Sequence, residues 1–478
     1  MFVTSTGEIH LDDLVERLRA LLGPQGLIER EAELERYNVS IEGMFRGRAR
    51  YVARPSSTAE VAAVVNACQA ARIPIVPQGG NTGLAGGAQP IDPRSVIVSM
   101  ERLRALRAID PDNDTITVDA GMTLAEVQSH AASVDRLFPL SLASEGSCQI
   151  GGNLSTNAGG TQVLRYGNIR ALTLGLEAVL PDGTVWNGLR GLRKDSAGYD
   201  LKHLFIGAEG TLGIITAATL RVFPRPRDIA TALVAVSTPG DALKLLHRTR
   251  QRLGDSLSAF ELMRRECMKW VLVALPDERS PFTEECPWYV LIETSGHDEP
   301  GMLRSAIEEI LSEATETGLV TDGVIATSEA QRRRLWALRE GQADAQKAGG
   351  AGIKHDISVP LSRVTDFIER ADSALVRAIP GIRPFAFGHL GDGNIHYNPM
   401  PPVGVTPDAF AERRNEVNRI VHDIVADLGG SISAEHGVGQ LRRSELTYYK
   451  SPVELHAFKT LKKAFDPHNL MNPGKIVT

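Results

Sequence analysis

The residues best suited to chemistry in this chain lie in two short glycine-rich segments near its end. The first, Gly388–Asn398, reads GHLGDGNIHYN and holds His389 and His396 on either side of an Asp-Gly pair. Asp-Gly is among the strongest two-residue hairpin turns. A hairpin folded about Asp392-Gly393 places His389 directly opposite His396, on one face and close enough for both imidazoles to reach one cation. Asn398 lies two residues beyond His396 and therefore points to the same face.

The second segment, Ser433–Gly439, reads SAEHGVG. Its Glu435 would complete a set of two imidazoles and one carboxylate, which suits zinc and also manganese, cobalt or iron, and leaves positions open for a substrate. His436 could then act as a general base. A single histidine is more often a hydrogen-bonded or surface residue, and the chain has 12. The concentration of these side chains in glycine-rich turns favours the functional interpretation.

Three further glycine-dense segments, Gln78–Gly83, Glu145–Gly160 and Gly207–Gly213, predict an anion-binding site. None has the spacing G-x-G-x-x-G at the head of a helix, which disfavours a Rossmann-type nicotinamide site. Successive amides in a glycine-rich turn can point inward around an anion, and the first segment lacks lysine, so its amides would hold a pyrophosphate. One such loop alone would be read as a tight surface turn. Three in one domain favour a bound cofactor.

These segments resemble the flavin-contacting loops of the vanillyl-alcohol-oxidase-type (PCMH) family of FAD-linked oxidoreductases. Pro77–Leu84 resembles the pyrophosphate loop, Glu145–Gly160 the second loop and Gly207–Ile214 the third. The resemblance implies non-covalent FAD, because Asn81 stands where some members attach the flavin through histidine, and the surroundings of Cys148 do not suggest attachment. The FAD-contacting residues that it implies are Pro77, Gly79, Gly80, Asn81, Thr82, Gly83, Leu84, Ser144, Glu145, Gly146, Ile150, Gly151, Gly152, Asn153, Thr156, Ala158, Gly159, Gly160, Glu209, Gly213, Ile214, Asn472 and Lys475.

The two histidine segments are similar to those of the D-2-hydroxyglutarate and D-lactate dehydrogenase branch of this family. The resemblance implies a divalent metal, most simply zinc, on His389, His396 and Glu435, with His436 as the catalytic base and a substrate contact. It also implies that Arg339 and Lys354 bind a substrate carboxylate. Asn398, which the strand periodicity places on the face of the two histidines, is expected to contact the substrate as well. The branch has a threonine where this chain has Ala343, and this departure leaves the identity of the substrate acid open.

The elements that must position these residues predict an α+β protein. Tyr51–Pro55, Thr58–Ala71 and Ile73–Val76 read as a β-α-β unit with Ser56 or Ser57 as the helix cap. Strands are expected at 115–118, 172–180 and 184–186, with helices at 10–22, 123–133, 301–317, 406–428 and 452–464. The resemblance adds a two-part FAD-binding domain, a substrate (cap) domain with an antiparallel sheet, and a short C-terminal segment that returns to the flavin.

Composition limits the classes of protein. The chain has 478 residues, 42% of them hydrophobic, and a net charge of −6, which fits a multidomain globular protein and gives no indication of a nucleic-acid surface. The predicted parts are a helical segment 1–45, an FAD-binding domain 46–226, a cap domain 227–428 and a C-terminal segment 429–478. No apolar run is long enough for a membrane span, and the acidic start lacks the pattern of a signal peptide. The four cysteines form no Cys-x-x-Cys pair. We therefore expect reduced thiols and a cytoplasmic enzyme.

Together these observations predict an FAD-dependent, metal-assisted dehydrogenase that oxidises a D-2-hydroxy acid to the 2-keto acid. D-2-hydroxyglutarate or D-malate is expected as substrate, with D-lactate or glycolate as the nearest alternative. A metal-free aryl-alcohol or sugar oxidase, a metal-dependent hydrolase without flavin, and a flavin-storage protein are the other interpretations. The expected electron acceptor is an electron-transfer flavoprotein or a quinone, and the expected assembly is a homodimer.

Overall fold

The computed structural model describes residues 11–477 and divides the chain into two compact units. The first unit comprises the chain up to Gly160, Gly167–Arg225 and the part from Glu435 onward; the second comprises Thr161–Tyr166 and Pro226–Ala434. Besides the short exchange at Thr161–Tyr166, the chain passes from the first unit to the second between Arg225 and Pro226 and returns between Ala434 and Glu435. The predicted segment 1–45 belongs to the first unit, and its residues 1–10 lie outside the described part of the chain.

A four-stranded sheet of order β1-β2-β4-β3 forms one half of the first unit. Its strands are β1 (Leu27–Ile28), β2 (Tyr51–Ala53), β3 (Ile75–Gln78) and β4 (Val96–Ser99). The predicted β-α-β unit is present, and β4 lies between its two strands, parallel to both. Ser57 caps the crossover helix α3 (Thr58–Ala70) by accepting a hydrogen bond from the amide of Glu60. Along β3, Ile75 faces the core under α3 and Val76 faces the opposite side, the alternation that a strand imposes.

A five-stranded antiparallel sheet of order β5-β6-β10-β8-β9 forms the other half. Its strands are β5 (Leu106–Asp110), β6 (Thr115–Asp119), β8 (Thr173–Val179), β9 (Val185–Gly188) and β10 (Ile214–Arg221), and β7 (Arg136–Leu137) pairs separately with β11 (Phe223–Pro224). The helices of this unit are α1 (Leu11–Leu22), α2 (Glu31–Asn38), α4 (Leu124–Ala132), α5 (Ile150–Thr156), α7 (Ile169–Leu172), α8 (Lys202–Phe205), α17 (Arg443–Tyr449) and α18 (Pro452–Phe465). Thr123 and Ser451 close capping boxes at α4 and α18, as their sequences require.

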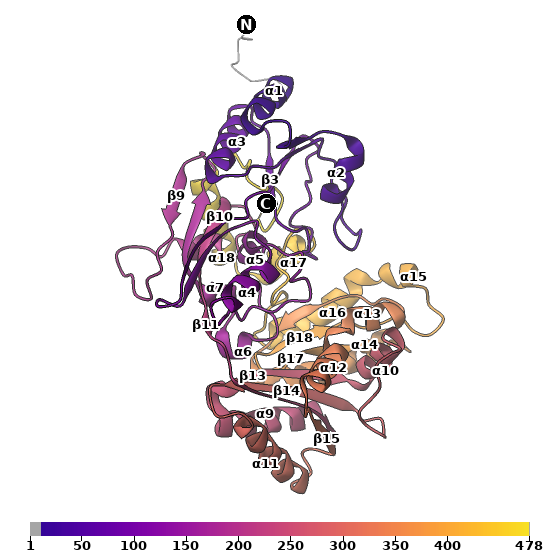
Figure 1. Cartoon of the computed structure of the whole chain (residues 1–478). Coiled ribbons are helices and arrows are strands. Elements are labelled where there is room, and N and C mark those ends of the chain that lie inside the picture. Colours follow the sequence, from indigo (N-terminus) through magenta and orange to yellow (C-terminus); the bar gives the residue numbers. More distant parts are fainter. Residues whose placement is uncertain (1–10, 478) are drawn as a thin grey trace. The chain divides into compact units, whose positions relative to one another are not determined.

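The second unit is built on a seven-stranded antiparallel sheet of order β15-β12-β14-β13-β17-β18-β16. Its strands are β12 (Asp228–Val236), β13 (Leu257–Arg264), β14 (Trp288–Gly296), β15 (Asp322–Ile325), β16 (Asp356–Ser358), β17 (Ala386–His389) and β18 (Asn394–Tyr397). Figure 1 shows these strands side by side with helices above and below them. The antiparallel sheet expected for this domain is therefore confirmed.

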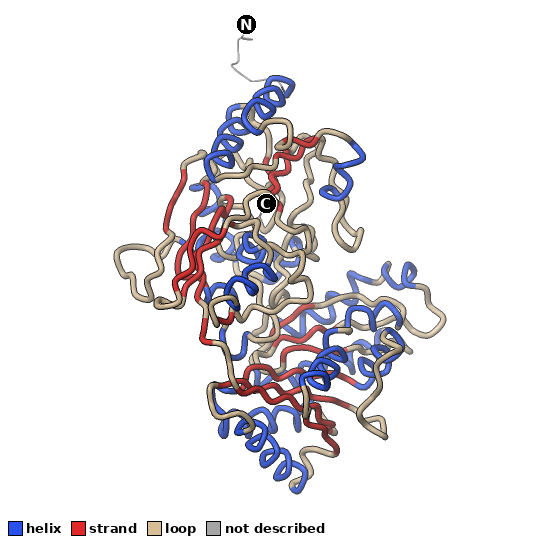
Figure 2. Tube along the Cα trace, viewed as in Figure 1, coloured by secondary structure: helices blue, strands red, loops and turns tan. Residues whose placement is uncertain are grey.

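Helices cover both faces of that sheet, as the helix and strand colours of Figure 2 show. The helices of the second unit are α6 (Val163–Tyr166), α9 (Pro239–Leu253), α10 (Arg265–Ala274), α11 (Met302–Glu316), α12 (Glu329–Glu340), α13 (Gln342–Ala348), α14 (Val364–Ala378), α15 (Pro407–Ala411) and α16 (Arg414–Asp427), with 3-10 turns η1 (Gly254–Ser256) and η2 (Leu361–Arg363). Residues of α10, α12 and α13 share one core with β12, β13, β14 and β17. This is the face that carries the candidate site.

The single helix predicted over 406–428 is wrong, because the chain forms two helices there. The amide of Arg413 donates to the carbonyl of Phe410 at 3.0 Å, a three-residue spacing that tightens the backbone between α15 and α16. Among residues 11–477, none of the helices has the length and apolar character that crossing a membrane requires.

Candidate active site

The three glycine-rich loops meet around one cavity of the first unit. The empty space that these loops surround, including open solvent at its mouth, is about 890 Å³. Gly83 and Gly152 line it, and a Cβ built at either glycine has no heavy atom within 4 Å. A side chain at these positions would take up cavity space that a ligand needs, so the glycines fit a site for a large cofactor.

The cavity contains 13 of the 23 residues predicted to contact FAD. They are Pro77, Gly79, Gly80, Asn81, Thr82, Gly83, Gly151, Gly152, Asn153, Thr156, Glu209, Gly213 and Ile214. The predicted residues outside its lining are Leu84, Ser144, Glu145, Gly146, Ile150, Ala158, Gly159, Gly160, Asn472 and Lys475. Lining residues that the sequence did not single out as FAD contacts include Gln78, Ala85, Gly87, Ala88, Met100, Gln149, Ser155, Gly210, Ile215 and His436.

Two residues of the C-terminal tail support the cavity wall from behind. The Asn472 amide donates to the carbonyls of Gly87 at 3.0 Å and Glu209 at 2.7 Å. The Lys475 ammonium, 1% exposed, donates to the carbonyl of Gln89 at 2.8 Å. Burial lowers the pKa of Lys475 to about 8, although the carboxylate of Glu209 opposes the shift. The tail therefore holds two cavity-lining segments that are distant in sequence.

Glu209 connects the third glycine loop to the loop that carries His436. Its carboxylate accepts hydrogen bonds from the amides of Val438 at 2.7 Å and Gly439 at 2.8 Å. Burial raises the pKa of Glu209, while the two amides and the cation of Lys475 oppose the shift. His436 lines the same cavity as Glu209. The predicted base thus lies where the predicted flavin loops converge, all within the first unit.

Glu435 precedes His436 and is also fixed within the first unit. Its Oε2 accepts a hydrogen bond from the amide of Gly160 at 3.2 Å, and its Oε1 lies 3.8 Å from Nε2 of His436. Gly160 was predicted as a flavin contact. Its amide links the second glycine loop to Glu435.

The hairpin of the second unit has a different register from the predicted one. His389 pairs with Asn394, and His396 pairs with Phe387, so a four-residue loop joins the strands. A two-residue type I′ turn needs positive φ at both central residues, and of Asp392 and Gly393 only the glycine has it, with φ +83°. The register is shifted by two residues, which preserves the face on which each side chain lies. His389 and His396 therefore remain on one face, with ring centroids 5.6 Å apart.

Glu261, on the neighbouring strand β13, engages two of the predicted site residues. Its Oε1 lies 2.8 Å from Nδ1 of His389, and its Oε2 accepts from Nε of Arg339 at 2.7 Å. Burial opposes ionisation of Glu261, yet His389 and Arg339 together hold its pKa below the usual value. Glu261 is not among the site residues predicted from the sequence. The sequence feature that could have identified it is a single acidic residue in the apolar strand LSAFELM. A charge buried in such a strand needs partners, which marks it as part of a polar site.

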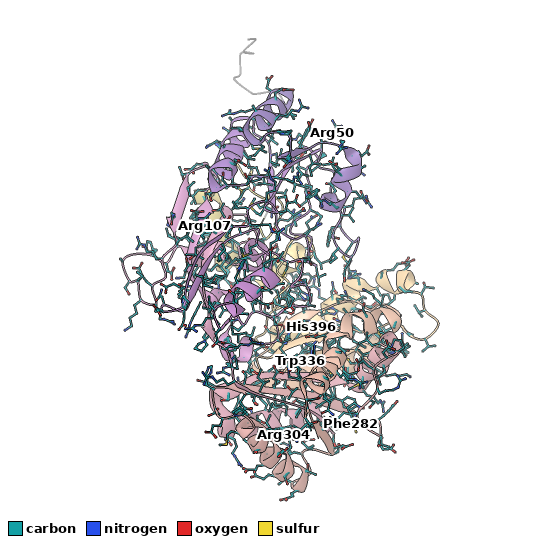
Figure 3. All side chains as sticks on the ribbon, in the orientation of Figure 1. Arg50, Arg107, Phe282, Arg304, Trp336 and His396 are labelled. Carbon is teal, nitrogen blue, oxygen red and sulfur yellow. The ribbon has the colours of Figure 1, made fainter. Side chains whose placement is uncertain are left out.

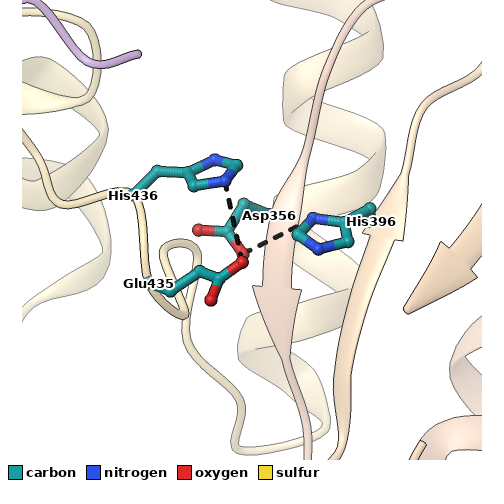
Figure 4. A group of neighbouring side chains, drawn as sticks. All are labelled: Asp356, His396, Glu435 and His436. Atoms are coloured by element: carbon teal, nitrogen blue, oxygen red, sulfur yellow. Dashed lines mark ion pairs between the residues drawn. The ribbon is translucent and has the colours of Figure 1, made fainter. Parts of the chain in front are cut away.

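Asp356 is a second carboxylate that sequence analysis missed. It pairs with His396 across strands β16 and β18, and its Oδ1 lies 3.9 Å from Nδ1 of His396. Figure 4 shows this pair of the second unit and the Glu435–His436 pair of the first. Imidazole nitrogens and carboxylate oxygens are the ligand types that zinc and related divalent metals take in proteins. The donor chemistry of both pairs therefore fits such a metal.

The other predicted substrate contacts also lie in the second unit. Lys354 is half-buried just before β16. Asn398 is buried, and its amide accepts from the amide of His355 at 2.8 Å and donates to Gln346 at 3.3 Å. Ala343 is exposed on α13. These contacts give Asn398 a fixed orientation. Of the two predicted substrate cations, Lys354 is more exposed than the buried Arg339.

Comparison with family descriptions matches both parts of the chain. Residues 225–476 match the C-terminal domain of FAD linked oxidases, and residues 49–188 match an FAD binding domain. The first match alone spans more than half of the chain.

Proteins of similar sequence carry related names. The D-2-hydroxyglutarate dehydrogenase of Bos taurus is 38% identical over 467 residues, covering 98% of this chain and 83% of that protein. The protein of the same name from Arabidopsis thaliana is 35% identical, covering 97% and 81%. A D-2-hydroxyglutarate–pyruvate transhydrogenase of Saccharomyces cerevisiae is 33% identical, covering 96% and 93%.

Solved structures with this fold are more distant in sequence. A p-cresol methylhydroxylase with bound substrate has a TM-score of 0.79 at 17% identity, covering 99% of this chain and 98% of that one. A 4-ethylphenol oxidase from Gulosibacter chungangensis has a TM-score of 0.75 at 18% identity, covering 99% of each chain. The predicted α+β fold of a two-domain flavoprotein is therefore confirmed.

The predicted cytoplasmic location is wrong by this comparison. The relatives from Bos taurus and Arabidopsis thaliana are both named as mitochondrial proteins. Neither the absence of a secretory pattern nor the absence of a membrane span distinguishes the cytoplasm from another compartment.

Proposed function

Because this chain belongs to the family of FAD-linked oxidases, we propose that it is an FAD-dependent dehydrogenase that oxidises D-2-hydroxyglutarate to 2-oxoglutarate. The names of its relatives support the substrate class. The observation on which the proposal rests most is the position of His436, which lines the cavity formed by the three glycine loops. A general base must lie within reach of the proton that it removes. FAD, when bound, supplies the acceptor for the two electrons and the hydrogen at C2.

The glycine loops would hold FAD without covalent attachment. Backbone amides of Gly79 to Gly83 are the groups available for its pyrophosphate, since that loop contains no lysine. His436 accepts the proton of the C2 hydroxyl, and Arg339 and Lys354 bind the second carboxylate of the substrate. Two cations suit a dianion because charge-assisted hydrogen bonds are stronger than neutral ones.

A divalent metal, most simply zinc, would be held by His389, His396 and Glu435, with Asp356 as a further oxygen donor. The ligand types support this assignment. When bound, the metal would supply a positive charge that makes the C2 hydroxyl more acidic. Because the histidines belong to the second unit and Glu435 to the first, substitution in either unit should lower the metal content.

The first experiment is a panel of D-2-hydroxyglutarate, D-malate and D-lactate with an artificial electron acceptor, before and after chelation. D-2-hydroxyglutarate should have the highest kcat/KM, and added Zn²⁺ should restore the chelated enzyme. Preference for D-lactate would identify the alternative acid, which the exchange of threonine for Ala343 leaves open. Turnover of aryl alcohols that chelation does not affect would contradict the metal-assisted mechanism.

The second experiment is His436→Ala, with His456→Ala as the control. His456 is exposed on α18 of the same unit. Loss of a general base lowers kcat by roughly 10²–10⁴-fold, with flavin absorbance and metal content unchanged. Turnover of His436→Ala equal to that of His456→Ala would remove His436 from the base role.

We further propose that an electron-transfer flavoprotein or a quinone reoxidises the flavin and that the enzyme is a homodimer. Stopped-flow reoxidation with each acceptor, and the mass in solution by light scattering, test these two points.

A further inference from the structure

Glu261 is a buried carboxylate shared by two residues of the candidate site. We propose that Glu261 is a positioning residue that orients His389 for metal binding and Arg339 for substrate binding at the same time. The inference rests on the proposed function for what those two residues bind. Its structural basis lies entirely within the second unit.

The geometry around Glu261 is set by the sheet. Glu261 and His389 are cross-strand partners of β13 and β17, so their side chains lie on the same face. Arg339 reaches this face from α12, and its guanidinium lies 5.1 Å from the ring centroid of Phe387, the residue paired with His396. Glu261 and Arg339 are 1% and 6% exposed. Side chains packed this tightly have few alternative rotamers.

The two carboxylate oxygens of Glu261 bind different side chains. The hydrogen bond at 2.8 Å engages Nδ1 of His389, so a metal bonded to this ring must use Nε2. A carboxylate behind a metal-bound histidine fixes its tautomer and orientation and makes it a better ligand. The other oxygen holds Nε of Arg339 at 2.7 Å, which orients the terminal nitrogens that would engage a carboxylate.

The same sheet contains a matched control. Glu293 on β14 is 5% exposed and accepts hydrogen bonds from Arg332 at 3.0 Å and from the ring nitrogen of Trp336 at 2.6 Å. Both partners lie on α12, the helix of Arg339; Trp336 is labelled in Figure 3. Glu293 thus binds an arginine and a ring N–H as Glu261 does, but it contacts neither histidine of the hairpin in the described residues.

The test compares Glu261→Gln with Glu293→Gln in the purified flavoprotein. Zn²⁺ affinity is measured by competition with a chromogenic chelator, and FAD content and the unfolding midpoint are measured in parallel. Glu261→Gln should weaken Zn²⁺ binding roughly 10- to 100-fold, the range for loss of such a supporting carboxylate. Glu293→Gln should leave Zn²⁺ affinity unchanged at a similar cost in stability.

Steady-state kinetics supply a second readout. Glu261→Gln should raise the KM for D-2-hydroxyglutarate about tenfold, because Arg339 loses a charge-assisted hydrogen bond that orients it. Glu293→Gln should not change KM. If Glu261→Gln does not fold, Glu261→Asp keeps the charge that balances Arg339 with a shorter reach, and it should show the same loss of Zn²⁺ affinity.

The outcomes separate this inference from the proposed function. Equal Zn²⁺ affinities of wild type and Glu261→Gln would overturn the inference alone, as would equal losses in Glu261→Gln and Glu293→Gln. A wild type that binds no Zn²⁺ would remove the proposed metal site and the inference together. A third outcome is that Glu261→Gln binds Zn²⁺ more weakly while the wild type oxidises none of the acids. This result would support the role of Glu261 toward His389 and overturn the proposed substrate.

Discussion

Glu209→Gln should loosen the loop of His436 without removing the fold. The carboxylate of Glu209 accepts from the amides of Val438 and Gly439 at 2.7 and 2.8 Å. A glutamine can accept from only one of them, and its own NH₂ group faces the other. The loop that carries His436, two residues before Val438, would then donate one neutral hydrogen bond to residue 209 in place of two charge-assisted ones.

The magnitude follows from these contacts. A hydrogen bond to a charged group contributes about 1.5–3 kcal/mol and a neutral one about 0.5–1.5 kcal/mol, so replacing two charged bonds by one neutral bond costs the loop roughly 2.5–4.5 kcal/mol. Burial raises the pKa of Glu209, which means that the ionised carboxylate carries a cost that glutamine avoids. We therefore expect a net loss of about 1–2 kcal/mol, or roughly 5- to 30-fold in the local equilibrium.

Hydrogen exchange of peptides that contain the amides of Val438 and Gly439 measures this loss directly. Exchange should become roughly 5- to 30-fold faster, and kcat should fall while FAD stays bound. Glu177→Gln is the control, because Glu177 is a buried acid of the same unit that binds Arg107 at 2.9 Å and Thr58 at 2.7 Å. Arg107 is labelled in Figure 3.

Two results would refute this reasoning. Exchange at Val438 and Gly439 that matches wild type would show that Glu209 does not hold the loop. Equal acceleration in Glu209→Gln and Glu177→Gln would show a general loss of stability in the first unit rather than a local one.

Three further outcomes are expected. Gly437→Ala should lower the unfolding free energy by about 1–3 kcal/mol and lower kcat, because φ is +76° and the new Cβ would lie 2.9 Å from Oε1 of Glu209. The control is Gly23→Ala, where φ is +67° and a Cβ would have no atom within 4 Å. In denaturant unfolding the control should show the backbone strain alone, and its kcat should not change. Lys475→Met should flatten the pH dependence of the unfolding free energy of flavin-depleted protein, because the pKa of Lys475 in the folded protein, about 8, lies below the usual 10.5. Between pH 8 and 10.5 only the unfolded chain keeps the proton, so the unfolding free energy of wild type should rise by up to about 3 kcal/mol over this range. An equal rise in the variant would contradict this prediction. Ala343→Thr should raise kcat/KM for D-2-hydroxyglutarate relative to D-lactate, and an unchanged ratio in a substrate panel would show that position 343 does not select the acid.

Local patterns determined much of the first unit. Ser57 caps α3 and Thr123 caps α4 because a side-chain oxygen next to a helix start can satisfy backbone amides without help from the rest of the chain. The glycine segments marked the cavity wall for a similar reason, since close backbone approach needs residues without a Cβ. The same-face position of His389 and His396 also followed from sequence, because strand periodicity preserves it under a two-residue shift.

The tertiary structure alone decided which residues support the site. Glu209 lies 229 positions before Val438 in the chain, and Glu261 lies 128 positions before His389. Contacts over such separations have no local signature, because any buried acid needs partners and the sequence does not say which ones fold against it. The hairpin register was decided in the same way, since Asp392 keeps a negative φ that a two-residue turn does not allow. Sequence therefore determined the types of chemical group at this site, and packing between distant segments determined how those groups are held.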